Sequence, residues 1–377
     1  MAGLYIHIPF CTQKCIYCDF LSGTNLSLRE QFIDALIAEM DCYLDFFRED
    51  KIRTIYFGGG TPSLLSVDEL RLIYDAIACR WDISAVEEFT IECNPDDLSE
   101  VYLQQLRVLP INRLSIGVQS FCDDELQWLN RRHTAQEAFD AVQIAQKVGF
   151  ENITIDLMFA LPVQTLESLN YSIDKALELG VQHISAYSLM FEPDSKITKL
   201  MELDRLQPLN EDVAADMFEL LSTRLTSAGY EQYEISNYAK LGFHSRHNSG
   251  YWHGMRYLGL GPSAHSFNGE KRWYNIADTI KYNNLVKDDN LKVKREEILT
   301  PDERFNELVF TALRTKIGVD LQDLRIRFGE SSYNQLLRQT KKYIDAGNMH
   351  ILNGRLSLTH KGIYISDSII SDFMIVD

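Results

Sequence analysis

The chain has 377 residues, with 54 acidic against 37 basic side chains and a formal net charge of −17 at pH 7. Unaided binding to nucleic acid or anionic lipid needs an excess of Lys and Arg, so this charge excludes such binding as the main activity. No run of ~18 uncharged apolar residues and no signal-peptide pattern occurs, so we expect a cytoplasmic protein without a transmembrane segment, and peripheral membrane contact stays open. The length predicts about two domains.

Strand-like and helix-like segments alternate from the start of the chain. The predicted strands are Gly3–Ile8, Ile52–Phe57, Glu88–Cys93, Arg113–Val118, Ile153–Phe159 and His183–Leu189. The predicted helices between them are Leu28–Phe47, Val67–Arg80, Glu100–Val108, Ala135–Val148 and Leu166–Leu179. This alternation predicts an α/β fold with a parallel sheet covered by helices, either an open doubly wound sheet or a partial (β/α)6 TIM-like barrel. Polar motifs at the strand ends favour the barrel.

Those polar motifs lie where a ligand would be bound. Gly58-Gly59-Gly60-Thr61 follows the second strand, and single polar residues lie at the ends of later strands or shortly after them: Glu92, Gln119, Arg131 and Asp156. Glycine lets a backbone approach a ligand closely. Asp and Glu are seldom buried unless they have partners, so these side chains are expected to bind a polar ligand. An ordinary tight turn and a salt-bridge network between strands are the alternatives.

Beyond residue 191 the pattern becomes irregular. A helix near Asp212–Ala228 leads to a region with seven aromatic residues between Tyr230 and Tyr257. Three helices, at Asp302–Leu313, Leu321–Phe328 and Tyr333–Ala346, then precede a hairpin at Met349–Leu358, with Asn353-Gly354 as its turn. This end of the chain is predicted to resemble a winged helix. We expect three domains: a barrel over residues 1–230, an aromatic-rich connecting region over 231–299 and the winged-helix-like part over 300–377.

A winged helix binds DNA in many proteins, and the C-terminal part of this chain is locally basic. Fold does not fix function, however, and the whole chain is acidic. We therefore predict a structural cap or a protein-contact surface, with no nucleic-acid partner.

Three cysteines near the start, Cys11, Cys15 and Cys18, form a C-x3-C-x2-C motif. Iron–sulfur clusters are usually held by four Cys, so three thiolates leave one iron open to a cofactor or substrate. A Cys3His zinc site that includes His7, or a disulfide, are the alternatives. The cluster is favoured because His7 is awkwardly placed four positions before Cys11, and no second Cys pair with zinc-type spacing follows.

The cysteine motif, preceded by Leu4-Tyr5-Ile6-His7-Ile8-Pro9-Phe10, resembles that of the radical S-adenosylmethionine (SAM) enzymes. Over essentially its whole length the chain is similar to the oxygen-independent coproporphyrinogen III oxidase family, and within it to the heme chaperone branch. The runs that carry this resemblance are Tyr5–Cys11, Gly58–Ser63, Ile91–Pro95, Arg113–Phe121, Leu129–His133 and Ile155–Pro162.

The resemblance implies a barrel of the radical SAM type and a set of ligand-binding residues. Cys11, Cys15 and Cys18 are expected to hold a 4Fe-4S cluster whose open iron binds SAM. The residues expected to contact SAM are Tyr5, Gly59, Gly60, Thr61, Glu92, Gln119, Arg131 and Asp156.

Two departures separate the chain from the oxidase pattern, which continues with a further Cys where this chain has Phe20 and which begins with a longer N-terminal extension. The run His247-Asn248-Ser249-Gly250-Tyr251-Trp252 instead resembles the H-N-x-x-Y-W run of the chaperone branch. Heme iron takes His as an axial ligand, so His247 is the predicted heme ligand, with Tyr251 and Trp252 packing on the porphyrin. Its rivals are His244, His253 and His265. The alternative is that His247 is hydrogen-bonded within a loop and the aromatic residues belong to the core.

These inferences together predict a heme chaperone that binds a 4Fe-4S cluster, SAM and heme. It would deliver heme to acceptor proteins such as respiratory hemoproteins. The alternative function is a radical SAM oxidoreductase that acts on a tetrapyrrole, an oxygen-independent coproporphyrinogen III dehydrogenase. The departures at Phe20 and at the N-terminus disfavour that activity, and no catalytic residue is assigned.

Overall fold

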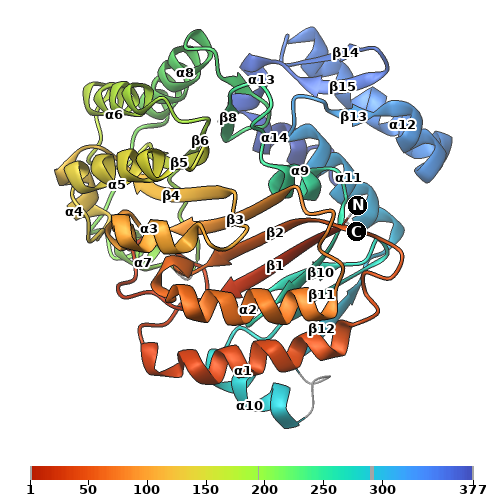
Figure 1. The fold of residues 1–377 in the computed structure, drawn as a ribbon. Helices are drawn as coiled ribbons and strands as arrows, with labels where there is room; N and C mark the ends of the chain where they lie inside the picture. Colours follow the sequence, from red (N-terminus) through yellow and green to blue (C-terminus); the bar gives the residue numbers. More distant parts are fainter. Residues whose placement is uncertain (1, 194, 289–292, 376–377) are drawn as a thin grey trace.

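The structure, a computed structural model, describes residues 2–193, 195–288 and 293–375. Its main element is a 12-stranded sheet with the order β12-β11-β10-β9-β1-β2-β3-β4-β5-β6-β8-β7 (Figure 1). Six of these strands are parallel neighbours in chain order: β1 (Ala2–Ile8), β2 (Ile52–Gly59), β3 (Glu88–Cys93), β4 (Arg113–Gln119), β5 (Asn152–Phe159) and β6 (His183–Ser188). The predicted α/β fold with six β/α units is therefore confirmed.

Helices connect these strands, and several of them begin at a side-chain cap that the sequence carries. The connecting helices are α1 (Arg29–Met40), α2 (Val67–Arg80), α3 (Glu100–Leu106), α4 (Asp123–Trp128), α5 (Ala135–Val148) and α6 (Leu166–Leu179). In α5, for example, Thr134 and Glu137 form a capping box at the start, and Gly149 ends the helix in the left-handed conformation.

The first predicted helix was too long. Its regular part ends at Met40, and a short 3-10 turn, Asp41–Tyr43, follows. The apolar residues beyond it still pack inward, because the Phe47 ring meets Trp81 edge-on at 5.5 Å and the Phe46 ring meets Trp273 at 5.9 Å. Helix-like spacing of apolar residues therefore continues past the point where the helix itself stops.

The region predicted to be an irregular connection forms regular elements that extend the barrel sheet at both edges. On one side lie β7 (Glu231–Gln232) and β8 (Asn237–Ala239), and β8 pairs with β6. On the other side lie β9 (Arg256–Leu260), β10 (His265–Phe267), β11 (Lys271–Asn275) and β12 (Lys294–Ile298). Strand β9 runs parallel to β1 and pairs with it from Ala2 to Ile6.

Helices accompany this extension of the sheet: α7 (Lys196–Glu202), α8 (Glu211–Ser227), α9 (Arg246–Trp252) and α10 (Thr279–Asp288). The predicted domain boundaries at residues 230 and 299 stay a prediction. None of the helices within the described ranges is both long and apolar enough to cross a bilayer.

The C-terminal part has its own small sheet and its own core. Helices α11 (Pro301–Leu313) and α12 (Leu321–Asp345) precede the hairpin of β14 (Met349–Leu352) and β15 (Arg355–Leu358), which pairs with β13 (Val319–Asp320). Gly329 interrupts α12 with a φ of 81°, where the sequence predicts a break between two helices. Two short helices, α13 (His360–Tyr364) and α14 (Ser366–Ser371), complete this part, drawn in blue in Figure 1.

Candidate cofactor site

The cysteine motif lies on the loop that leaves the carboxyl end of β1. The Cys11 amide donates to the Gly23 carbonyl at 3.0 Å, and the Ile16 amide donates to the Leu129 carbonyl at 3.3 Å. Two reciprocal side-chain bonds add to these: Gln13 Nε2 donates to the Asn130 carbonyl at 3.0 Å, and Asn130 Nδ2 donates to the Lys14 carbonyl at 2.9 Å. The loop is thus attached to the segment that follows β4 before any cofactor binds.

The three sulfur atoms fit a cluster better than the alternatives. All three cysteines are free thiols of intermediate exposure, so they form no disulfide. Burial raises the pKa of the Cys18 thiol to about 11, and the charges of Cys15 and Cys11 add to this.

A zinc site with His7 has no support in the geometry. His7 Nε2 lies 2.9 Å from the Leu21 carbonyl oxygen and Nδ1 lies 3.1 Å from the Tyr5 hydroxyl, so both ring nitrogens have partners. Within the described residues, no three His, Cys, Asp or Glu side chains form a group that could hold a single metal ion. Thiolates that bind separate irons of a cube need not converge on one point.

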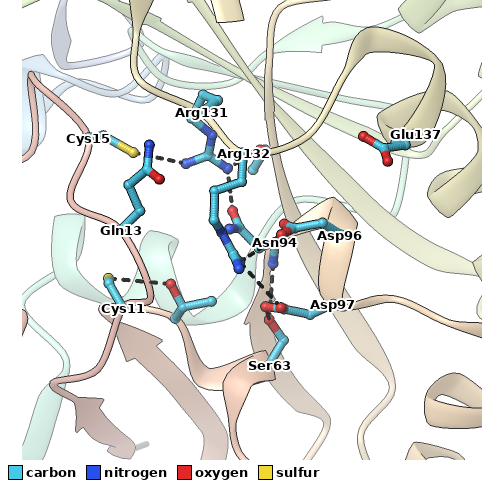
Figure 2. Close-up of polar contacts among 12 residues, drawn as sticks. Cys11, Gln13, Cys15, Ser63, Asn94, Asp96, Asp97, Arg131, Arg132 and Glu137 are labelled. Atoms are coloured by element: carbon cyan, nitrogen blue, oxygen red, sulfur yellow. Dashed lines mark hydrogen bonds and ion pairs between the residues drawn. The ribbon is translucent and has the colours of Figure 1, made fainter. Parts of the chain in front are cut away.

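Arg131 connects the cysteine loop to the strand ends (Figure 2). Its guanidinium donates to Cys15 Sγ at 3.3 Å, to the Gly117 carbonyl at 2.7 Å and to the Asn94 side chain. The next residue, Arg132, pairs with Asp96 at 2.8 Å and with Asp97 at 3.3 Å. Sequence reasoning singled out Arg131 but missed this supporting network, although Asn94 and the two Asp residues directly follow a strand.

The glycine triplet is required by the protein's own packing. A Cβ at Gly60 would lie 2.6 Å from the Phe10 carbonyl oxygen and 2.9 Å from that of Ile8, and one at Gly59, where φ is +109°, would lie 2.7 Å from the His7 ring. The Gly59 amide donates to Glu92 at 3.0 Å. The packing of the turn is therefore enough to explain why glycines occur here, which is the tight-turn alternative. Contact of the glycines with SAM stays a prediction.

The carboxylates of Glu92 on β3 and Asp156 on β5 lie within electrostatic reach of each other and of Arg113 on β4. Burial raises the pKa of Glu92 to about 7, with the Asp156 charge adding to this, and burial raises the pKa of Asp156 to about 6. Sequence reasoning missed Arg113, which is 1% exposed and donates to Thr154 Oγ1 at 2.5 Å. Its charge lowers the pKa of both carboxylates, so it favours their ionised, ligand-binding form. A charged residue within an apolar strand was the available signal.

Two other predicted SAM residues lie at the end of a strand or just after one. Gln119 ends β4 with a φ of 69°, an uncommon conformation for a residue other than Gly that occurs often at functional sites. The hydroxyl of Thr61 lies 3.4 Å from Cys11 Sγ, which connects the turn after β2 to the cysteine loop.

The predicted heme ligand, His247, is buried among aromatic side chains. It is the second residue of the short helix α9, is 1% exposed, and packs its ring against Tyr56 at 5.0 Å. Its Nδ1 lies 2.8 Å from Thr54 Oγ1 and its Nε2 lies 2.8 Å from the Tyr251 hydroxyl. Both ring nitrogens of His247 therefore have partners, as in the alternative, although His247 lies in a helix rather than a loop and Tyr251 and Trp252 are only partly buried. Heme ligation by His247 stays a prediction.

A cavity of about 680 Å³ begins beside Tyr5 and His7 and extends to the C-terminal part of the chain. Its aromatic lining comes from Phe20, Tyr251, Trp252, Tyr257, Phe267 and Phe310. Phe20, at the position where the oxidase pattern has Cys, is 61% exposed. Two buried donors of lining residues, Trp252 Nε1 and Arg272 Nε, lack hydrogen-bond partners among the described residues. This cavity is here called the aromatic pocket.

Comparisons with known proteins show which families and folds this chain is similar to. The model of the Radical SAM superfamily matches residues 5–176, and that of the HemN C-terminal domain matches residues 299–365. The fold is similar to that of the solved structure of coproporphyrinogen III oxidase (HemN) from Escherichia coli, a radical SAM enzyme, with a TM-score of 0.85 over 99% of this chain and 90% of that chain at 22% identity.

Curated relatives extend the similarity to the whole chain. The heme chaperone HemW of Bacillus subtilis is 36% identical over 99% of both chains, and that of Lactococcus lactis is 36% identical over 99% of this chain and 97% of its own. With full-length similarity at this level, the chain belongs to the radical SAM superfamily and, within it, to the family of the proteins named heme chaperone HemW.

Proposed function

We propose that this protein is a cytoplasmic heme chaperone that binds a 4Fe-4S cluster, SAM and heme and delivers heme to acceptor proteins such as respiratory hemoproteins. The observation that carries this proposal is the 36% identity to a heme chaperone over 99% of both chains. The aromatic pocket supports the proposal. Its volume of about 680 Å³ lies within the range of about 300–1,000 Å³ that is usual for ligand pockets, and its apolar walls with a few polar groups suit heme.

The cluster would be held by Cys11, Cys15 and Cys18. One-electron reduction of SAM is the chemistry that such a cluster supplies when bound. Arg131 would keep a positive charge beside the Cys15 sulfur, and Glu92 would orient the Gly59 amide and the Tyr56 hydroxyl, which donates to it at 2.7 Å.

SAM would lie at the carboxyl ends of the strands. Its ammonium, carboxylate and ribose hydroxyls need carboxylate acceptors and cationic donors, which Glu92, Asp156 and Arg131 supply. The full proposed set is Tyr5, Gly59, Gly60, Thr61, Glu92, Gln119, Arg131 and Asp156.

We expect Asp156→Asn to weaken SAM binding about tenfold, because a charged hydrogen bond in a buried site is lost. Equilibrium dialysis with anaerobically reconstituted protein measures this, and the cluster absorbance should not change. The matched control is Asp140→Asn, at an exposed position of α5. Equal SAM affinity in wild type and Asp156→Asn would remove Asp156 from the site.

The proposed function is tested by two assays on the same reconstituted protein. We expect hemin to bind at about one equivalent per chain, and we expect no conversion of coproporphyrinogen III in the presence of SAM and a reductant. Conversion at enzyme-like turnover would replace the chaperone proposal with the oxidoreductase.

A further inference from the structure

Four histidines are candidates for the heme iron, and their surroundings differ. Both ring nitrogens of His247 are occupied, by Thr54 and Tyr251. His244 Nε2 lies 3.1 Å from a Glu231 carboxylate oxygen, and His253 Nδ1 lies 2.6 Å from the Ser249 carbonyl. Neither His244 nor His253 lines the aromatic pocket.

His265 is the exception. Its side chain is exposed and lines the aromatic pocket, and no group among the described residues hydrogen-bonds to either of its ring nitrogens. Partial burial lowers its pKa below the ordinary value, and the Arg272 charge adds to this, which favours the neutral imidazole over the charged form.

The orientation of His265 is fixed by the sheet. In β10 the residue pairs with Tyr274 of β11, and the two rings stack at 5.2 Å with 26° between their planes. Its neighbour Ser266 is fully buried and donates to the Gly259 carbonyl at 3.2 Å, so side-chain alternation turns His265 and Phe267 to the opposite face.

The surroundings of His265 suit a porphyrin. Phe267 lies opposite Tyr257 of β9 on one side and opposite Arg272 of β11 on the other. The Phe267 and Tyr257 rings and the Arg272 guanidinium therefore share the face of the sheet that carries His265. Arg272 also pairs with Glu307 of α11, which leaves its Nε as the donor without a partner. Apolar walls, one unoccupied imidazole and a cation match a macrocycle with a central metal and acidic side chains.

We propose that His265, rather than His247, supplies the axial nitrogen to heme iron in the aromatic pocket. This inference rests on the proposed heme binding. His247 is then a positioning residue, because its hydrogen bond to the Tyr251 hydroxyl holds the Tyr251 ring in the wall of the pocket. The two residues are four positions apart in α9, so about one helical turn brings their side chains together.

The test is a hemin titration of wild type, His265→Ala and His247→Gln, followed by the Soret band. Gln keeps a hydrogen-bonding side chain at the buried position but offers no imidazole. We expect His265→Ala to lose the wild-type Soret position and to weaken hemin binding about tenfold or more, and added imidazole should restore the band. His247→Gln should keep the wild-type Soret position.

His253→Ala, at an exposed position outside the pocket, is the matched control. An unchanged Soret band in His265→Ala would overturn the assignment, and its loss in His247→Gln but not in His265→Ala would return the role to His247. Failure of the wild type to bind hemin would instead refute the proposed function itself.

Discussion

Single replacement of Cys11, Cys15 or Cys18 by alanine is expected to abolish the iron–sulfur cluster. The wild-type protein should contain about four irons and four acid-labile sulfides per chain after anaerobic reconstitution, and each variant should contain almost none. The reason is that three thiolates are the minimum that holds a cube with one open iron, so the loss of one leaves two irons without protein ligands. Iron and sulfide analysis with the visible absorption spectrum measures the effect.

The control for this series is Cys79→Ala, at an exposed position of α2. It should leave the iron content and the colour unchanged. The hydrogen bonds of the loop to Gly23, Leu129 and Asn130 come from the backbone or from other side chains, so the variants should remain folded. A colourless wild-type protein that contains zinc after reconstitution would contradict the cluster assignment.

In the wild type, ionisation of Glu39 is expected to lower the free energy of unfolding by about 3 kcal/mol as the pH rises. Glu39→Gln should abolish this part of the pH dependence. Glu39 is buried on α1 and accepts from the Gly261 amide at 2.8 Å, from Asn275 Nδ2 at 2.6 Å and from the Tyr282 hydroxyl at 2.5 Å. Burial nevertheless raises its pKa to about 7, above the value of an unfolded chain. The folded protein therefore binds the proton more tightly than the unfolded chain.

The sign of the effect follows from this difference. The contribution of Glu39 to the free energy of unfolding is fully present below its unfolded pKa of about 4.3 and is lost as the pH rises through about 7. Urea unfolding at about pH 5 and about pH 7.5 should show a smaller fall in stability for Glu39→Gln than for wild type. Glu30→Gln, at an exposed position of the same helix, should behave like wild type. A fall of equal size in Glu39→Gln would contradict the prediction.

The sequence predicts the barrel strands well because their signals are local. Each of the six predicted segments is rich in strand-forming residues and alternates with helical segments that begin at caps such as Ser66 and Thr134. The structure has all six strands within two residues of the predicted ends. The outer strands β9 to β12 were missed. They are short, and what holds them together is pairing with β1 and with one another rather than a pattern within each segment.

The site residues also divide into those with a local sequence signal and those whose partners come together only in the fold. The residue types at Cys11, Glu92 and Asp156 indicate ligand binding, and their positions follow from the ends of the strands. His247 is different, because the chemistry of the imidazole suggests a ligand while its hydrogen-bond partner Thr54 lies 193 positions away in the chain. Arg113 and Glu39 gain their partners only through the fold, and the single local signal at Arg113 is a charged residue within a strand.

The position of β1 within the sheet has a consequence for synthesis of the chain. Strand β1 lies between β2 and β9, so its second edge is covered only when residues 256–260 have been made. At about 5–20 residues per second, the chain waits on the order of ten to forty seconds between the two pairings. During this time the growing polypeptide exposes the edge of an apolar strand, which is a template for aggregation. Nascent chains and fragments that end before residue 256 are therefore expected to depend on general protein-folding factors until the last neighbour of β1 is in place.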